Sequence, residues 1–195
     1  MAGIEAYTDL LGRVITLVPG VEDNLALDAL RRIMPEFFSR TGIWREELTV
    51  TTEADVASYA LTSPAGTKIR QVAEVKNAGA DVAIHTSAYW YNRKLSKLTF
   101  ETHDIPSRTG DALTVTVVIV PERWASAETY PAHLLEDYGE AIAAGAAADL
   151  LAMTGKPWTN LDAALFRKKE YRNGLGEAAG QVMRKGTERS LEMRP

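Results

Sequence analysis

The sequence of 195 residues contains no cysteine. This absence excludes disulfide bonds, thiolate zinc sites, iron–sulfur clusters and cysteine nucleophiles. The sequence also lacks long apolar runs, because none approaches the roughly 20 residues that a membrane-spanning helix needs. Residues 1–5 show neither the basic nor the apolar region of a secretory signal, so we expect no signal peptide. A chain of this length buries on the order of 70% of its unfolded surface and can fold without a covalent or metal crosslink.

Residues that commonly carry catalysis are also scarce. Only three histidines occur, and no serine lies in a G-x-S-x-G turn. His103 is followed by Asp104. Beside a serine, a histidine can act as the general base and an aspartate carboxylate can orient it. His133 and Glu136 have the i, i+3 spacing that places two metal ligands on one helix face, but a second such pair is missing. These two pairs leave open one alternative function, a small hydrolase or a metal-dependent enzyme.

Charge is distributed unevenly along the chain. The whole sequence has 26 acidic and 22 basic residues, a net charge of −4. Residues 166–195 contain 8 Lys and Arg against 4 Asp and Glu, whereas the other 165 residues contain 14 against 22. An acidic body therefore ends in a basic C-terminal segment. This segment is interpreted either as a solvated tail or as a tail that docks on an acidic partner. An acidic protein with few interleaved aromatic residues is a poor candidate for a nucleic-acid reader.

Two helices are predicted in the first part of the chain. Between Ile4 and Val18, apolar residues recur at three- and four-residue spacing and form one apolar face. A second apolar stripe follows Asp23 and contains Pro35, which removes one backbone donor. Gly42 predicts the end of this second helix.

Two more helices are predicted in the last part of the chain. The first covers residues 129–153, and its middle, 141–148, consists mainly of small residues that allow another helix to approach closely. The second begins at Leu161, after Asn160. We expect it to weaken at Gly174 and Gly176, because each glycine costs roughly 1 kcal/mol relative to alanine in a helix.

Between these helical stretches the hydrophobic period falls toward two residues, which is typical of strands. The stretch 115–120 has high β-propensity and no charge, so we expect a central or covered strand there. The predicted strands cover residues 48–52, 56–61, 68–75, 81–85, 97–102 and 113–120.

The resulting fold class is α+β. We expect a helical bundle formed by the N- and C-terminal helices, with an antiparallel β-rich segment inserted between them. The expected helical domain comprises residues 1–45 and 128–185, and the inserted β-rich domain comprises 46–127. Residues 186–195 are polar and unpatterned, so we expect a flexible C-terminal tail.

Four segments in this order carry a resemblance to a known family. They are 27–45, which ends in Trp44-Arg45; the strand 113–121; 130–145; and 151–160, which contains Gly-Lys-Pro-Trp. Together they resemble the head–tail adaptor, or connector, proteins of tailed bacteriophages, from about residue 18 to residue 185. A tail-completion protein is a related possibility within the same class of virion proteins.

The resemblance implies a structural protein without catalytic, cofactor-binding or metal-binding residues. Such adaptors form a ring, a dodecamer in this family, under the portal protein and bind a tail, tail-tube or nozzle protein on the other side. DNA passes through the channel without sequence-specific binding. The expected location is the neck of the virion, with the host cytoplasm as the site of assembly and no membrane involved. The residues that the resemblance assigns to portal binding are Arg184, Lys185, Arg189, Leu191, Met193 and Arg194.

Overall fold

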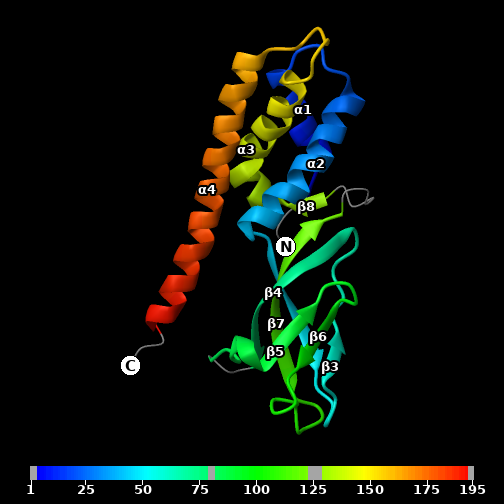
Figure 1. The fold of residues 1–195 in the computed structure, drawn as a ribbon, viewed down its shortest axis with the longest axis vertical. Coiled ribbons are helices and arrows are strands. Elements are labelled where there is room, and N and C mark those ends of the chain that lie inside the picture. The colour runs from blue at the N-terminus through cyan, green and yellow to red at the C-terminus, as the bar shows by residue number, and fades with distance from the viewer. Residues whose placement is uncertain (1–3, 79–81, 123–128, 193–195) are drawn as a thin grey trace. The chain divides into compact units, whose positions relative to one another are not determined.

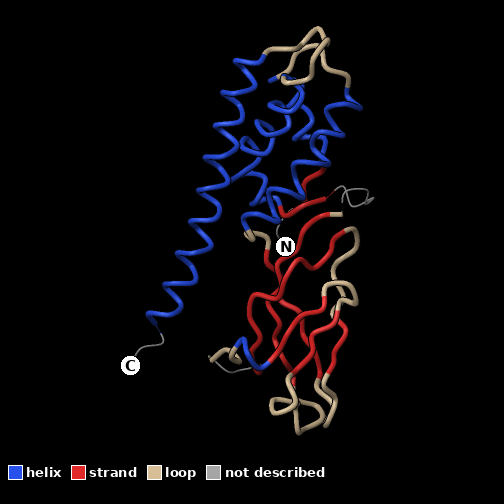
Figure 2. Tube along the Cα trace, viewed as in Figure 1, coloured by secondary structure: helices blue, strands red, loops and turns tan. Residues whose placement is uncertain are grey.

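The computed structural model describes residues 4–78, 82–122 and 129–192, and it is of mixed α+β class (Figure 1). The chain divides into two compact units. Residues 1–43 and 121–195 form one unit, which we call the helical unit, and residues 44–120 form the other, the β unit. The β unit is thus an insertion in the sequence of the helical unit. It covers residues 44–120, whereas the insertion expected from the sequence covers 46–127. Figure 2 shows that the α-helices belong to the first unit and most strands to the second.

The helical unit begins with a short antiparallel strand pair. Strand β1 (Ile4–Ala6) pairs with β8 (Thr129–Pro131). The sequence prediction that helices begin at residues 4 and 129 is therefore wrong, because the backbone groups of these residues enter a β-ladder instead. Helix α1 (Tyr7–Leu17) and helix α3 (Ala132–Leu151) begin directly after the two strands.

Helix α2 (Asp23–Thr41) follows α1 and supplies the large aromatic residues of the core. Phe37 and Phe38 are fully buried, and their rings meet edge to face at a centroid distance of 5.7 Å. Gly42 ends the helix as predicted: it adopts φ +61°, and its N–H donates to the Phe38 carbonyl at 3.0 Å. Such a left-handed residue satisfies a carbonyl that the helix itself leaves free.

Helix α3 contacts each of the other α-helices, α1, α2 and α4 (Leu161–Glu192). Residues 142–148 of α3 are all buried. A β-carbon at Gly145 would lie 2.7 Å from Cδ2 of Tyr171 on α4 and 3.0 Å from Cγ2 of Ile33 on α2. The prediction that the small residues of this helix permit close helix packing is confirmed.

Helix α4 differs from its prediction in two respects. It is continuous through Gly174 and Gly176, where weakening is expected from the sequence, and it extends to Glu192, into the region 186–195 expected to be a flexible tail. Gly174 is buried against Ala141 of α3, a close contact that only glycine permits. Residues 187–192 contain no proline or glycine that would end the helix. The start of α4 is capped as expected, because the Ala163 N–H donates to Asn160 Oδ1 at 3.0 Å.

The β unit contains two three-stranded sheets. In the first, β7 (Ala112–Pro121) lies between β2 (Arg45–Thr51) and β4 (Thr67–Asn77), and it pairs with β2 in antiparallel fashion. Residues 115–120 of β7 are all buried. The prediction of a central, covered strand at this stretch is confirmed. Its nearly continuous apolar sequence, interrupted by Thr116, fits a strand whose two faces are both covered.

In the second sheet, β6 (Lys97–Phe100) lies between β3 (Ser58–Ala60) and β5 (Tyr89–Asn92), and both pairs are antiparallel. Strand β5 is not predicted from the sequence, which predicts a strand at 81–85 instead. Over the described residues 82–85, only Ala83 makes a β-bridge, to Lys76. The local hydrogen bonds of His85 with Ser87 favour a turn there over a strand.

We predict opposite effects of alanine at two glycines of α4. A β-carbon at buried Gly174 would overlap the Cβ of Ala141 on α3, whereas nothing lies within 4 Å of one at exposed Gly176. Overpacking costs about 1–3 kcal/mol, which exceeds the helix-propensity gain, so Gly174→Ala should lower the free energy of unfolding. Gly176→Ala should raise it by about 0.5–1 kcal/mol. Urea unfolding of both variants checks this, and equal effects of the same sign would contradict the contact.

Candidate functional site

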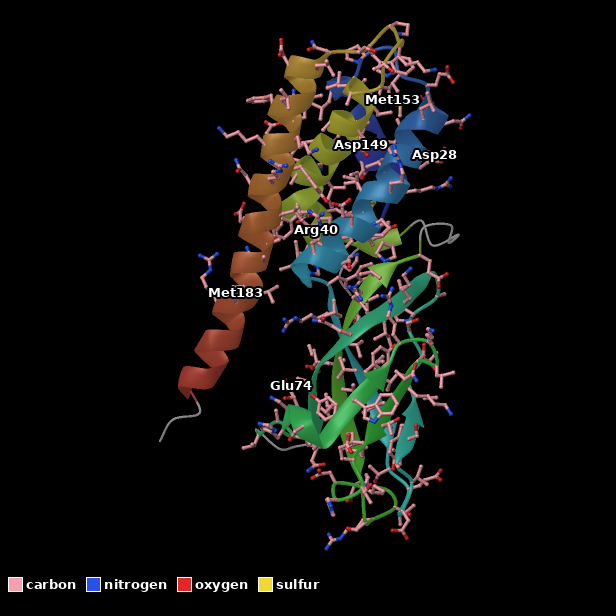
Figure 3. The ribbon with its side chains drawn as sticks, viewed as in Figure 1. Asp28, Arg40, Glu74, Asp149, Met153 and Met183 are labelled. Carbon is pink, nitrogen blue, oxygen red and sulfur yellow. The ribbon has the colours of Figure 1, made fainter. Side chains whose placement is uncertain are left out.

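The packing of α4 on α3 positions the C-terminal segment that the sequence singles out. Gly145 lies opposite Tyr171, and Ala141 lies opposite Gly174, so the two helices run antiparallel in a fixed register. Continued along the helices, this register places Ala132, the first residue of α3, opposite about residue 183. The last nine residues of α4, 184–192, therefore continue beyond α3 for about 13 Å at 1.5 Å per residue. We call this stretch the overhang, and Figure 3 marks Met183 just before it.

The overhang contains four of the six residues assigned to portal binding. Arg184 is exposed at its start. Lys185, Arg189 and Leu191 follow on the same helix, whereas Met193 and Arg194 lie outside the described residues. The structure thus brings the first four positions together on one helix end that extends past its neighbour.

The charge of Arg184 acts on a buried tyrosine of α3. Tyr138 is only 2% exposed, and burial raises the pKa of its phenol. The carboxylates of Asp137 and Glu177 raise this pKa further, and Arg184 lowers it. The start of the overhang is therefore electrostatically coupled to the helical unit.

The histidine pairs considered as catalytic or metal-binding groups are exposed and lie in different units. His103 and Asp104 are in a turn of the β unit. His133 is in the first turn of α3, and Glu136 follows at the start of the next turn. The third histidine, His85, has its Nδ1 2.8 Å from Ser87 Oγ and accepts the Ser87 N–H. Over the residues that the structure describes, no cluster of three or more histidine and carboxylate side chains is arranged to hold a metal ion.

Two grooves flank α4, and sequence reasoning missed both. The first, of about 320 Å³, lies between α1, α3 and α4, and we call it the acidic groove. The second, of about 580 Å³, lies between α2, α3 and α4, and we call it the basic groove. The charged lining of the acidic groove is Asp137, Glu140, Glu170 and Glu177 with Arg167, and that of the basic groove is Arg40, Lys168 and Arg172 with Glu36 and Asp149.

Ion pairs neutralise only part of the acidic groove. Glu170 binds Arg167 at 2.8 Å, and Glu140 binds Arg13 of α1 at 3.2 Å. Asp137 and Glu177 are exposed and form no salt bridge with any described residue. Two uncompensated carboxylates therefore remain on this side of α4.

The basic groove has the opposite imbalance. Glu36 pairs with Arg40 at 3.2 Å, and Asp149 pairs with Arg32 at 3.7 Å; Figure 3 shows Arg40 on α2 and Asp149 on α3. Lys168 and Arg172 are exposed and make no salt bridge within the described part of the chain. Two uncompensated cations therefore remain on this side of α4.

Apolar side chains also line the basic groove. Leu161 and Leu165 of α4 are 60% and 68% exposed, although both have large aliphatic side chains. Single exposed leucines are ordinary, but two neighbours in one groove form a contiguous apolar surface. Tyr171 lines the same groove; it is only 6% exposed, and its hydroxyl has no hydrogen-bond partner among the described residues.

Burial raises the pKa of Tyr171 well above its ordinary value of 10.0. The carboxylate of Glu36 raises it further, Arg40 opposes this effect, and Asp149 adds to it. The phenol therefore stays neutral over the physiological range and places no charge in the groove.

Comparison with known proteins adds no further assignment. Neither a protein-family model nor a curated protein matches the sequence. Over the described residues, the helices are too short or too polar for one of them to cross a lipid bilayer.

We predict that Tyr171→Phe leaves the free energy of unfolding unchanged or raises it by up to about 1 kcal/mol, because it removes a buried hydroxyl that lacks a partner. Tyr59→Phe is the matched control. Its hydroxyl donates to the Glu53 carbonyl at 3.1 Å and accepts the Glu53 N–H at 3.2 Å, so this variant should lose about 1 kcal/mol. Urea unfolding of both variants measures the difference.

The same tyrosine predicts a loss of stability at alkaline pH. Since the pKa of Tyr171 is raised on folding, its contribution is fully present below pH 10.0, where the unfolded tyrosine is protonated. Above pH 10.0 the unfolded chain releases this proton first, so the free energy of unfolding falls as pH rises. Tyr171→Phe should reduce the slope in this window. A slope identical to that of the unaltered protein would contradict the pKa shift.

Proposed function

We propose that this protein is a head–tail adaptor of a tailed bacteriophage, a structural virion protein that forms a ring under the portal. In this role it extends the DNA channel and offers a docking surface to tail components. The observation that carries the proposal is the overhang, a helix end that continues beyond α3 and whose sequence contains Arg184, Lys185 and Arg189. The order of sequence segments that resembles the adaptor family supports it.

The arrangement of the chain supports the same role. We infer that the four α-helices form a bundle built from both ends of the chain, and that the β unit is inserted in it. Helices from residues 1–43 and 121–195 belong to one compact unit, and residues 44–120 form the other. In the proposed role, the helical unit with its overhang contacts the portal, and the β unit faces tail components or neighbouring subunits.

The overhang suits a docking element for a physical reason. Most helix stability in proteins comes from packing, so a helix end that continues past its neighbouring helix gains stability from a partner that covers it. A partner groove that covers residues 184–192 would supply this packing. The basic residues favour a partner surface with negative charge, since opposite charges steer association.

The acidic body of the protein suits a channel for DNA. Outside residues 166–195, the chain carries 22 acidic against 14 basic residues. A wall with the sign of the phosphate backbone lacks the cations that would neutralise phosphates and hold the duplex. DNA therefore passes such a wall without being retained.

The proposal is tested by co-sedimentation with the portal ring encoded by the same genome, followed by negative-stain imaging. An adaptor adds a ring beneath the portal. The triple variant Arg184→Glu, Lys185→Glu and Arg189→Glu should weaken portal binding at least about tenfold, since a charge-assisted hydrogen bond contributes about 1.5–3 kcal/mol. A portal that stays bare with the unaltered protein would contradict the adaptor role.

A matched control separates this site from net charge. The variant Arg93→Glu, Lys94→Glu and Lys97→Glu changes the charge by the same amount at exposed positions of the β unit. We expect its binding to the portal to remain within about threefold of the unaltered protein, because distant exposed charges are screened. If both triple variants lose binding equally, the overhang is not the docking element.

Ending the chain after Met183 should remove portal binding without unfolding the protein. By the register of α3 and α4, the described residues beyond this point continue past the start of α3, so the free energy of unfolding should change by less than about 1 kcal/mol. Circular dichroism and urea unfolding check the fold, and co-sedimentation checks binding. A truncated chain that still binds the portal with full affinity would contradict the proposed role of the overhang.

A further inference from the structure

The two grooves lie on opposite flanks of the same helix. Successive residues of an α-helix are rotated by about 100°, so residues three, four and seven apart share a flank. Lys168 and Arg172, four residues apart, line the basic groove. Glu170 and Glu177, seven apart, line the acidic groove, and by the same rotation they lie about 180° around the helix from Lys168 and Arg172.

The uncompensated charges of the two flanks are complementary. On the acidic flank, Asp137 and Glu177 form no salt bridge within the described chain. On the basic flank, Lys168 and Arg172 form none either. Two exposed carboxylates thus correspond to two exposed cations on the other side of α4. Opposed potentials of this kind steer association and fix its orientation.

The apolar surfaces of the two flanks are complementary as well. Leu161 and Leu165 are exposed along the basic groove. The aliphatic lining of the acidic groove consists of two alanines, Ala141 and Ala144, and the half-buried Leu17. Exposed leucines on one side and a recess with small side chains on the other form a contact that buries apolar surface from both.

We infer that a second copy of this chain binds to α4, with the basic groove of one copy facing the acidic groove of the next. Because two different faces meet, the contact is head-to-tail. A head-to-tail contact repeats from copy to copy and closes into a ring when its rotation permits. The inference rests on the proposed function in so far as that function requires a ring, and it assigns the surfaces through which the ring forms.

The absence of cysteine makes a crosslinking test direct. Asn173→Cys lies in the acidic groove and Leu165→Cys in the basic groove, and neither changes a charge. We expect a mixture of the two single variants to form disulfide-linked dimers roughly tenfold faster than either variant alone, since complementary charges accelerate encounter by 10-fold or more. The rate should fall as salt is raised.

Lys169→Cys is the control variant, because it lies on α4 and lines neither groove. Its mixture with either groove variant should react no faster than the single variants alone. If the mixture of the two groove variants shows no excess over this control, the head-to-tail contact is wrong. Faster crosslinking of Asn173→Cys with itself would indicate a symmetric contact and would also overturn it.

A charge exchange tests the electrostatic part of the same contact. In the Asn173→Cys background, Asp137→Lys should slow crosslinking to Leu165→Cys. Adding Arg172→Glu to the Leu165→Cys chain should restore the rate, because opposite charges again face each other. Failure of the second change to restore the rate would show that these two residues do not meet.

These outcomes separate the inference from the proposed function. Head-to-tail crosslinks together with a bare portal would leave the contact in place and reject the adaptor role. A ring beneath the portal without excess head-to-tail crosslinking would support the adaptor role and reject these surfaces.

Discussion

The close approach of α3 and α4 is the constraint on which the rest of the helical unit depends. It requires Gly145 beneath the ring of Tyr171 and Gly174 beneath Ala141, positions at which a β-carbon has no space. Packing at this density tolerates no sliding of one helix along the other. The register therefore follows from two missing side chains, and the register determines where α4 leaves α3 and which of its residues face each groove.

The inserted β unit depends on a different constraint. Strand β7 has neighbours on both sides and buried residues from Val115 to Val120, so it carries no solvent-facing stripe. Its uncharged sequence would be an aggregation hazard at an open edge, and the pairing with β2 and β4 removes that hazard. Each unit thus has its own core, and each could respond to substitutions independently.

Local sequence patterns predict those structural features that neighbouring residues determine, such as a helix end. They do not predict features that depend on contacts between residues far apart in the sequence. Gly42 ends α2 because a glycine satisfies the helix end within its own turn, which is readable from sequence. The strand pair of Ile4–Ala6 with Thr129–Pro131 joins opposite parts of the chain, so no local period reveals it. Helix propensity alone predicts a weak point at Gly174, because its contact with Ala141 joins two helices and has no signal in the local sequence. The grooves do leave a signal in the sequence: Lys168 and Arg172 are four residues apart and share one flank of the helix, and Glu170, two residues from each, lies on the opposite flank.

Helix α4 serves two proposed contacts with different segments. The groove residues lie between Leu161 and Glu177, and the overhang begins at Arg184. Contacts between copies and contacts with a portal would then occupy successive parts of one continuous helix. Because an α-helix has a fixed rise and rotation per residue, the orientation of the first segment in a ring also sets the orientation of the second. A ring of copies would hold its overhangs at fixed angles relative to a symmetric partner. Several weak contacts then form together, and the overall affinity of the ring exceeds that of one copy.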